Sequence, residues 1–342
     1  MSAPVEAMEG RVLGSRGGGR SVALPAGAFL LVLLLLVPVQ LVVDPPGLLL
    51  ERFLPGAGWL ELVLAGLYAA WLTRKMLDPS LAPRWRHRLW TIFTVVFFAQ
   101  LIIGLLGAER FLMTGELHLP VPALIIAGPL FRGGGLFMPI LFGATVLLVG
   151  PAWCSHLCYI GAWDHWAARI GRRRPGAPSG NRHRVQWAVL LLVVGAALLL
   201  RVLGVSGMAA GVLAAAFGLF SVGVMLAASR KRGQMAHCSG FCPLGLVSTW
   251  AGRINPFRVK LGAGCSRCGA CTFACRYGAL QDEDLAAGSP GRGCTLCGDC
   301  LPRCREGHLT YAFPGLSAGA SRSLFIVMVV ALHASFLAVA RM

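Results

Sequence analysis

The chain has 342 residues, 56% of them hydrophobic, and a positive mean hydropathy. This composition excludes an ordinary soluble protein and favours a membrane protein whose main partner is the lipid bilayer. The formal net charge is +17. In a soluble protein such an excess would favour nucleic acid as the partner. The placement of the charges along this chain favours membrane orientation instead, and we predict no nucleic-acid partner.

Seven apolar segments are candidate membrane spans, because a helix needs about 20 residues to cross the hydrocarbon core. Five are long: Ala23–Val43, Leu89–Gly107, Val185–Leu203, Met208–Ser229 and Ser323–Ala340. Two are shorter: Gly58–Leu72 and Gly135–Trp153. The run Val121–Phe131 is too short to cross and is predicted to be re-entrant or interfacial.

The distribution of Lys and Arg tests this count, because cytoplasmic segments are enriched in basic residues. With the N-terminus inside, 26 of the 31 basic residues fall on the inner side and four on the outer side. The inner segments are then 1–22, 73–88, 154–184 and 230–322. The asymmetry predicts a cytoplasmic N-terminal tail over residues 1–22 and a C-terminus on the opposite side of the membrane.

All twelve cysteines fall in these inner segments. Thiols stay reduced in the cytoplasm, so an even number of cysteines does not indicate disulfides here. Metal ligation is the leading alternative.

The longest inner segment contains the motif C-x2-C-x2-C-x3-C twice, as CSRCGACTFAC and CTLCGDCLPRC. Three thiolates at this spacing surround one [4Fe–4S] cluster, and in bacterial two-cluster ferredoxins the fourth cysteine ligates the other cluster. We therefore predict two clusters. The first set of ligands is Cys265, Cys268, Cys271 and Cys304, and the second is Cys294, Cys297, Cys300 and Cys275. The alternative is zinc, which uses separated cysteine pairs.

This segment is predicted to be a ferredoxin module over residues 254–316. Gly269 and Gly298 lie inside the cysteine loops, where the backbone must approach a cluster closely. Arg276 and Arg305 follow the fourth cysteines, where bacterial ferredoxins have proline. Each arginine is either a positive charge that raises the cluster potential or a solvated surface residue.

A second cysteine pattern is duplicated. PAWCSHLCYIGAWDHWAARI, from Pro151, aligns with MAHCSGFCPLGLVSTWAGRI, from Met235, at an offset of 84 residues. Each copy follows an apolar span and carries C-x3-C. A parallel duplication relates its halves by an axis along the membrane normal, so we predict that the two pairs converge at the inner face.

The four C-x3-C cysteines are Cys154, Cys158, Cys238 and Cys242. Four thiolates in one site suit an additional Fe–S cluster. A dithiol redox pair or buried structural thiols are the alternatives, because C-x3-C is a weaker signal than C-x2-C.

The order of spans, the two C-x3-C pairs, "CPLG" in the second of them, INPFRV (Ile254–Val259) and the twin ferredoxin motif together resemble the membrane polyferredoxins. That family includes the quinol dehydrogenase membrane subunit of periplasmic nitrate reductase (NapH type) and the C-terminal half of the nitrous oxide reductase regulator (NosR type). The resemblance covers about Leu89 to Leu309. It implies a bacterial inner-membrane protein that passes electrons from membrane quinol through clusters to a partner oxidoreductase. The family's cysteines map onto the twelve named above.

A quinol site needs an apolar slot and a proton acceptor. The long outer loop of the first half contains Glu109, Glu116 and His118, which are candidates for that role. An ordinary polar loop is the alternative. His156 lies beside the first cysteine pair and is expected at the surface, with an extra ligand as the alternative. His333 is expected to be packed or hydrogen-bonded within the last span.

The complete prediction is a membrane all-α helical bundle of about seven spans with a small inserted α+β module of the bacterial 2[4Fe–4S] type. Residues 23–253 form the bundle with the duplicated pairs, 254–316 the module, and 323–340 the C-terminal span. The predicted function is electron relay between the quinone pool and a redox partner protein, which makes the chain the electron-transfer subunit of a quinol-linked oxidoreductase. The alternative is a membrane ferredoxin for assembly or redox regulation of a respiratory metalloenzyme.

Overall fold

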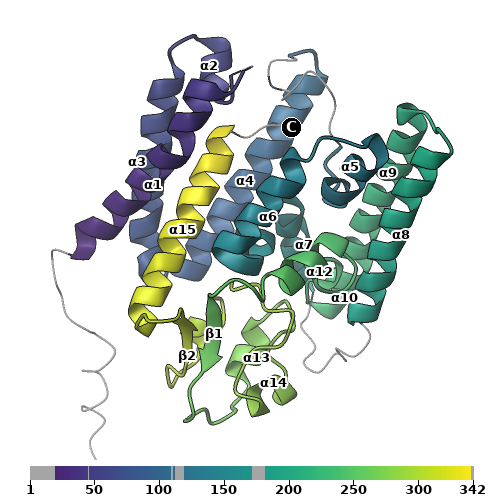
Figure 1. Ribbon diagram of the computed structural model, residues 1–342. Helices are drawn as coiled ribbons and strands as arrows, with labels where there is room; N and C mark the ends of the chain where they lie inside the picture. The colour runs from purple at the N-terminus through teal and green to yellow at the C-terminus, as the bar shows by residue number, and fades with distance from the viewer. Residues whose placement is uncertain (1–19, 45, 109–110, 112–118, 172–181, 340–342) are drawn as a thin grey trace, which may run out of the picture.

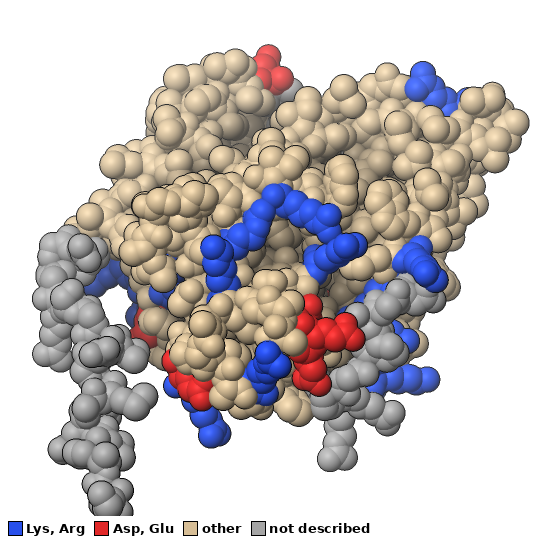
Figure 2. Space-filling view, turned by 60° about the horizontal axis from the view of Figure 1, so that its bottom comes forward, with Lys and Arg blue, Asp and Glu red and all other residues tan. Residues whose placement is uncertain are grey.

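The computed structural model describes residues 20–44, 46–108, 111, 119–171 and 182–339. Long helices stand side by side as a bundle, and a small unit with two strands lies at one end of them (Figure 1). We call residues 258–312, from the first strand to the second, the cysteine module. Charged side chains gather at the module end of the molecule, while the flanks of the bundle are largely uncharged (Figure 2).

The bundle is built from seven of the described helices. They are α1 (Arg20–Val42), α3 (Gly58–Leu77), α4 (Ala82–Leu105), α6 (Phe137–Val149), α8 (Arg182–Val202), α9 (Gly207–Val224) and α15 (Ala318–Val339). The shorter helices are α2 (Leu49–Phe53), α5 (Leu124–Arg132), α7 (Tyr159–Ile170), α10 (Arg230–Arg232), α11 (Ala236–Gly240), α12 (Pro243–Ala251), α13 (Ala270–Ala274) and α14 (Asp282–Ala286). Two short segments are 3-10 helices, η4 (Gly150–Ala152) and η7 (Leu301–Arg303), and two are π-helices, η5 (Trp153–Leu157) and η6 (Met225–Ser229).

Within the described residues, six helices are long and apolar enough to cross a membrane. They are α1, α4, α6 extended to Leu157, α8, α9 extended to Arg232, and α15. Their outward faces carry large apolar side chains such as Leu34, Leu191 and Leu219, which are 70%, 66% and 73% exposed. Exposed apolar surface of this extent needs a lipid environment. The chain is therefore a membrane protein, as predicted.

The remaining long helix, α3, is not among these six. It has 20 residues, and its uncharged stretch is short because Glu61 lies near one end and Arg74 and Lys75 lie near the other. It packs against α1 and α15, and Gly66 lets the ring of Phe29 approach its backbone. Its location within the bundle is compatible with a seventh span, which stays a prediction. By contrast, α5 has only nine residues and is too short to cross.

The last helix, α15, packs against α1, α3, α4 and α6. It is separated from these helices in sequence by the cysteine module, yet it lies among them in space (Figure 1). The chain thus leaves the bundle, forms the module and returns. The module is tethered to the bundle at both of its ends.

The cysteine module begins with strand β1 (Arg258–Leu261) and ends with strand β2 (Leu309–Ala312), and the two strands pair antiparallel. Val259 pairs with Tyr311 in the register, and both are buried. The Tyr311 ring stacks on Phe325 of α15, with ring centroids 4.8 Å apart. Just before β1, the Asn255 side chain donates to the carbonyl of Leu147 at 2.7 Å. Aromatic packing and this hydrogen bond therefore fix the module beneath the bundle.

Candidate functional site

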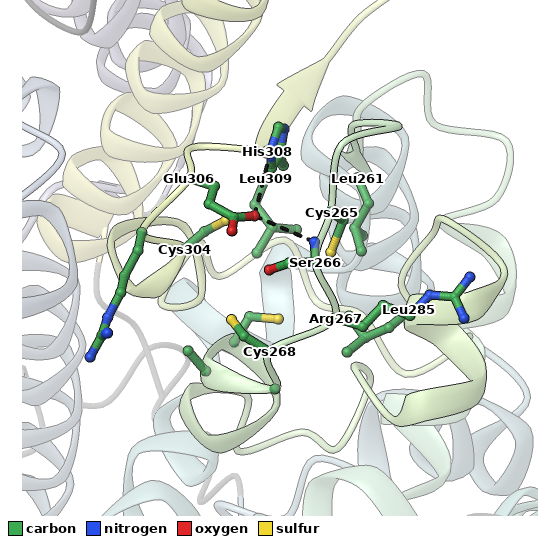
Figure 3. A pocket seen from close by; sticks show the side chains of 14 residues that line it. Leu261, Cys265, Ser266, Arg267, Cys268, Leu285, Cys304, Glu306, His308 and Leu309 are labelled. Atoms are coloured by element: carbon green, nitrogen blue, oxygen red, sulfur yellow. Dashed lines mark hydrogen bonds and ion pairs between the residues drawn. The ribbon is translucent and has the colours of Figure 1, made fainter. Parts of the chain in front are cut away.

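The cysteine module contains two pockets, each lined by four cysteines. The first pocket is lined by Cys265, Cys268, Cys271 and Cys304. Figure 3 shows three of these side chains around one space, with Cys304 reaching in from the second motif. The second pocket is lined by Cys275, Cys294, Cys297 and Cys300. Each motif thus supplies three cysteines to one pocket and one to the other, which is the grouping that the spacing predicts; ligation itself stays a prediction.

The backbone repeats from one cysteine loop to the other. Arg267 and Leu296, two residues after the first cysteine of each motif, have positive φ angles of 54° and 55°. Gly269 and Gly298, two residues further on, have φ angles of 74° and 77°. Left-handed residues that alternate with residues of ordinary backbone conformation curve the chain and can turn N–H groups into a concave loop that favours an anionic group. This geometry suits the sulfide-rich surface of an Fe–S cluster.

The two pockets differ in their surroundings. Cys268 of the first pocket is exposed, whereas all four cysteines of the second are at least partly buried. The second pocket faces the bundle, as the following contacts establish.

A buried ion pair joins the second motif to α4. Asp299, between the second and third cysteines of that motif, accepts hydrogen bonds from Arg86 at 2.9 and 2.5 Å. Arg86 is 1% exposed and also donates to the carbonyl of Ser155 at 2.8 Å. Burial raises the pKa of Asp299, but Arg86 and the neighbouring His87 hold it well below its usual value. The carboxylate therefore stays charged, and one guanidinium ties both cysteine regions together.

Tyr277 links the second pocket to the first C-x3-C pair. Its ring lines the pocket, and its hydroxyl donates to the carbonyl of Cys154 at 3.1 Å. Burial is the main cause that raises the pKa of Tyr277, so its hydroxyl remains a neutral donor. Close by, the hydroxyl of Ser155 donates to the carbonyl of Thr295 at 2.9 Å. The second pocket and the C-x3-C region are thus in direct contact.

Arg276 is an anchor in this interface. Its guanidinium donates to the carbonyls of Ala168 and Gly233, both at 2.9 Å. Its own carbonyl accepts the N–H of Met235 at 2.9 Å. Arg305, the corresponding residue after the other motif, is exposed. Of the two roles predicted for these arginines, the solvated one describes Arg305, while Arg276 holds the module against α7 and the turn after α10.

The four C-x3-C cysteines lie together at the module end of the bundle, and all four are buried. In each copy the second cysteine precedes a helix: Cys158 caps α7 and Cys242 caps α12, both with extended backbone. Against the effect of burial, the N–H groups of Ile160 and Gly161 lower the pKa of the Cys158 thiol. Those of Leu244 and Gly245, at the repeat offset, lower the pKa of the Cys242 thiol in the same way. The duplication in sequence is thus a duplication in structure.

The two copies also reach across to each other. In the first copy, Asp164 accepts the N–H of Cys238 at 2.9 Å. Its counterpart in the second copy is Ser248, whose hydroxyl lies 3.4 Å from the Cys154 sulfur. Each copy therefore positions the first cysteine of the other, which is what a pseudo-twofold arrangement requires.

A pair of glycines has the same reciprocal relationship. A Cβ atom on Gly161 would lie 2.8 Å from the carbonyl oxygen of Cys154, and one on Gly245 would lie 2.5 Å from that of Cys238. Trp90 packs against Gly161 as well, and its indole donates to the Cys158 carbonyl at 2.7 Å. Any side chain at either glycine would displace the cysteine loop.

The donor set fits an Fe–S cluster. Burial raises the pKa of the Cys158 thiol to about 11, although neighbouring N–H groups oppose this shift. Burial, with a contribution from Cys158, raises the pKa of the Cys242 thiol to about 12. The pKa of the Cys238 thiol is raised well above its usual value, first by burial and then by Asp164 and the other thiols. Such thiols are neutral alone and become thiolates when a metal compensates their charge. Among the described residues, no three His, Cys, Asp or Glu converge on a single metal ion. In a [4Fe–4S] cluster each thiolate binds a different iron atom, so the ligands do not converge on one point. The absence of a single-ion site among these residues therefore does not bear on a cluster.

The other predicted residues have mixed outcomes. Glu109, Glu116 and His118 lie outside the described residues, so their role stays a prediction. His156 is not at the surface as expected: it is 1% exposed, because η5 turns it between Ser155 and α15. His333 is hydrogen-bonded, as expected, with its Nε2 atom 3.2 Å from the Tyr68 hydroxyl.

Sequence reasoning missed Arg86, Asp299 and Tyr277. Asp299 and Tyr277 lie close to cysteines of the motifs, but nothing in the local spacing indicates a partner on α4 or on the C-x3-C loop. Arg86 belongs to a cluster of basic residues that the topology argument explains without a specific role.

One comparison with known proteins gives a match. A family model described as a 4Fe-4S binding domain (Fer4_5) matches residues 130–178 and 211–263. Each matched stretch contains one C-x3-C pair, and both end before the twin ferredoxin motifs begin at Cys265. No curated protein matches the chain, and no solved structure does. The chain therefore carries a 4Fe-4S binding domain together with helices suited to a membrane.

Proposed function

We propose that this protein relays electrons between the membrane quinone pool and a partner oxidoreductase through three iron–sulfur clusters. The observation that supports the proposal is the serial arrangement of three groups of four cysteines. The first group is at the end of the bundle, the second is joined to it by Tyr277, and the third includes the exposed Cys268.

Each group would hold one [4Fe–4S] cluster. The two clusters in the cysteine module would be ligated across motifs, as assigned above, and the four C-x3-C cysteines would ligate the cluster at the end of the bundle. When bound, such clusters accept and release single electrons at potentials set by charge, hydrogen bonds and exposure.

The residues around the groups determine what each can do. The buried C-x3-C group and the second pocket are shielded from solvent by the contacts of Arg86, Tyr277 and Arg276. The exposed side of the first pocket is where a redox partner protein would dock, since Cys268 is exposed there. This difference in exposure gives the relay a membrane end and a partner end.

Quinol would react at the membrane end. Oxidation of one quinol to quinone releases two electrons and two protons, with the electrons passing to the partner oxidoreductase and the protons to water. The loop residues Glu109, Glu116 and His118 remain proposed proton acceptors. We further propose the membrane polyferredoxin family of the NapH and NosR type, a bacterial inner membrane, a cytoplasmic N-terminus and module, and a periplasmic C-terminus.

The test is metal analysis followed by redox titration of anaerobically purified protein in lipid nanodiscs. We expect about twelve iron and twelve sulfide per chain from three four-iron clusters, and EPR signals that develop when a quinol is added. Zinc in place of iron would refute the cluster assignment. Iron at the expected level with clusters that no quinol reduces, at any potential spanned by membrane quinones, would refute the relay.

A further inference from the structure

A second kind of cavity lies beside the C-x3-C region. It is enclosed by the second half of α9, residues 120–123 before α5, and the turn into α12. The space is small and partly open, with about 320 Å³ between these elements when the part open to the surroundings is included. Its lining is mainly apolar, with Phe217, Val121, Ile160 and Met225 among the contributors.

This cavity is distinct from the space that the four C-x3-C cysteines share. The pockets of the cysteine module are each lined by all four members of a group, whereas only Cys242 of the C-x3-C group lines this one. An occupant would therefore lie next to the group without taking the place of its cluster.

The cavity contains a buried polar atom that lacks a partner. His237 lines the cavity and is 3% exposed. Its Nδ1 atom has no hydrogen-bond partner among the described residues. Its ring lies 5.5 Å from that of Phe241, which stacks on Phe217. Buried imidazole nitrogens are seldom left unpaired in folded proteins, and an oxygen atom of a ligand in this cavity would give this one a partner.

A second polar group lies on the α9 side of the cavity. Ser221 is 7% exposed and lines the cavity. Its hydroxyl donates a hydrogen bond to the carbonyl of Phe217 at 2.9 Å. The hydroxyl oxygen keeps a lone pair that can accept a hydrogen bond from a ligand hydroxyl, such as that of a quinol.

The surroundings select the class of ligand. Leu219 and Phe220, on the neighbouring face of α9, are 73% and 61% exposed, as lipid-facing residues are. A ligand would therefore enter from the membrane. An acyl chain has no oxygen for His237, whereas a quinone ring is flat, apolar and carries an oxygen atom at each of two opposite positions.

We propose that this cavity binds the ring of a membrane quinone, with His237 as the hydrogen-bond partner of one ring oxygen. The proposal rests on the function proposed above and gives it a location.

The first test is labelling of the complete, cluster-loaded protein in nanodiscs with an azido-substituted ubiquinone analogue. After illumination and proteolysis, we expect the label on residues 217–225 or 120–123, and an excess of unlabelled ubiquinone should prevent it. Label found only elsewhere, for example in the loop that carries Glu109 and Glu116, would overturn the proposal. This result needs no variant and so does not depend on the folding of one.

The second test fills the cavity. A Cβ atom on Gly218 would lie 2.7 Å from Val121, so Gly218→Leu places its side chain within the cavity. We expect decylubiquinone to bind at least tenfold more weakly, with unchanged iron content. The matched control is Gly223→Leu on the same helix, where an added Cβ meets nothing within 4 Å; it should bind like wild type. Equal affinity for all three proteins would overturn the proposal.

The third test addresses the imidazole. His237→Leu should weaken binding about tenfold, and His237→Gln should restore part of the loss because its amide can hydrogen-bond the ring oxygen. Equal affinity in His237→Leu and wild type would overturn the role of this residue. If wild-type protein neither binds the quinone nor accepts electrons from quinol, the proposed function fails; if it does both but the label and the Gly218→Leu result exclude this cavity, only the location fails.

Discussion

At the scale of single residues, Arg86 has the most consequential position. It lies in α4 and is almost fully buried, yet it contacts both a motif of the cysteine module and the backbone of the C-x3-C loop. A charge in such a location is tolerated only when it is paired and hydrogen-bonded. The same pairing makes the contact specific, because Asp299 has no second guanidinium beside it among the described ion pairs.

We predict that Arg86→Met destabilises the docked module by about 3 kcal/mol, because it leaves the Asp299 carboxylate buried with only His87 beside it. The measurement is thermal unfolding in nanodiscs, combined with limited proteolysis of the module. Arg84→Met, at an exposed position on the same helix, is the control and should behave like wild type. Overlapping melting curves for the Arg86 and Arg84 variants would contradict this assignment.

At the scale of elements, the duplicated unit is the end of a bundle helix, a loop with two cysteines, and a short helix whose N-cap is the second cysteine. Both copies place a cysteine at the N-terminus of an amphipathic helix, where backbone N–H groups favour a thiolate. The repeat could be read from the sequence because the motif and the helix start are local. The reciprocal contacts of Asp164 and Ser248 could not, because they join residues of different copies.

We predict that Cys154→Ser lowers the iron content by about four per chain and leaves the EPR signals of the two clusters of the module intact. The reason is that Cys154 belongs to the C-x3-C group alone. Iron analysis and EPR of the purified variant check this. Unchanged iron would return the four cysteines to the role of structural or redox thiols.

A second prediction at this scale uses the paired glycines. Gly161→Ala and Gly245→Ala each drive a Cβ atom against a cysteine carbonyl, so each should lower iron by about the same four atoms. Gly195→Ala, on α8 with open space around the added carbon, should not change the iron content. If only one of the two variants loses iron, the copies do not contribute equally to the site.

At the scale of the whole molecule, the fold places a membrane bundle at one end and an exposed cysteine group at the other. The chain returns to the bundle through α15 after the module, so the two parts are fixed at both ends. The number of spans determines on which side of the membrane each end lies. Six helices satisfy length and composition within the described part, and α3 would be the seventh.

Reporter fusions test this arrangement. With seven spans, a reporter after Gly56 should be periplasmic and one after Ser80 cytoplasmic, because α3 lies between them. A reporter after Ser321 should be cytoplasmic and one after Met342 periplasmic. If the reporters after Gly56 and Ser80 lie on the same side of the membrane, α3 does not cross it, and the predicted span count is wrong.

The sequence by itself determined the features that depend on local pattern. Hydropathy identified the six apolar helices, since burial in lipid requires long apolar runs. Cysteine spacing grouped the eight cysteines of the module as the two pockets have them, and the repeat revealed a third group of four. These properties follow from a few neighbouring residues, so no knowledge of distant contacts is needed.

Only the tertiary structure decided which distant residues meet. Arg86 and Asp299 are far apart in the chain, as are Tyr277 and Cys154. The burial of His156 and the cavity beside His237 also depend on how separate helices pack. Periodicity and spacing carry no information about such pairs, because packing geometry, not local conformation, brings them together.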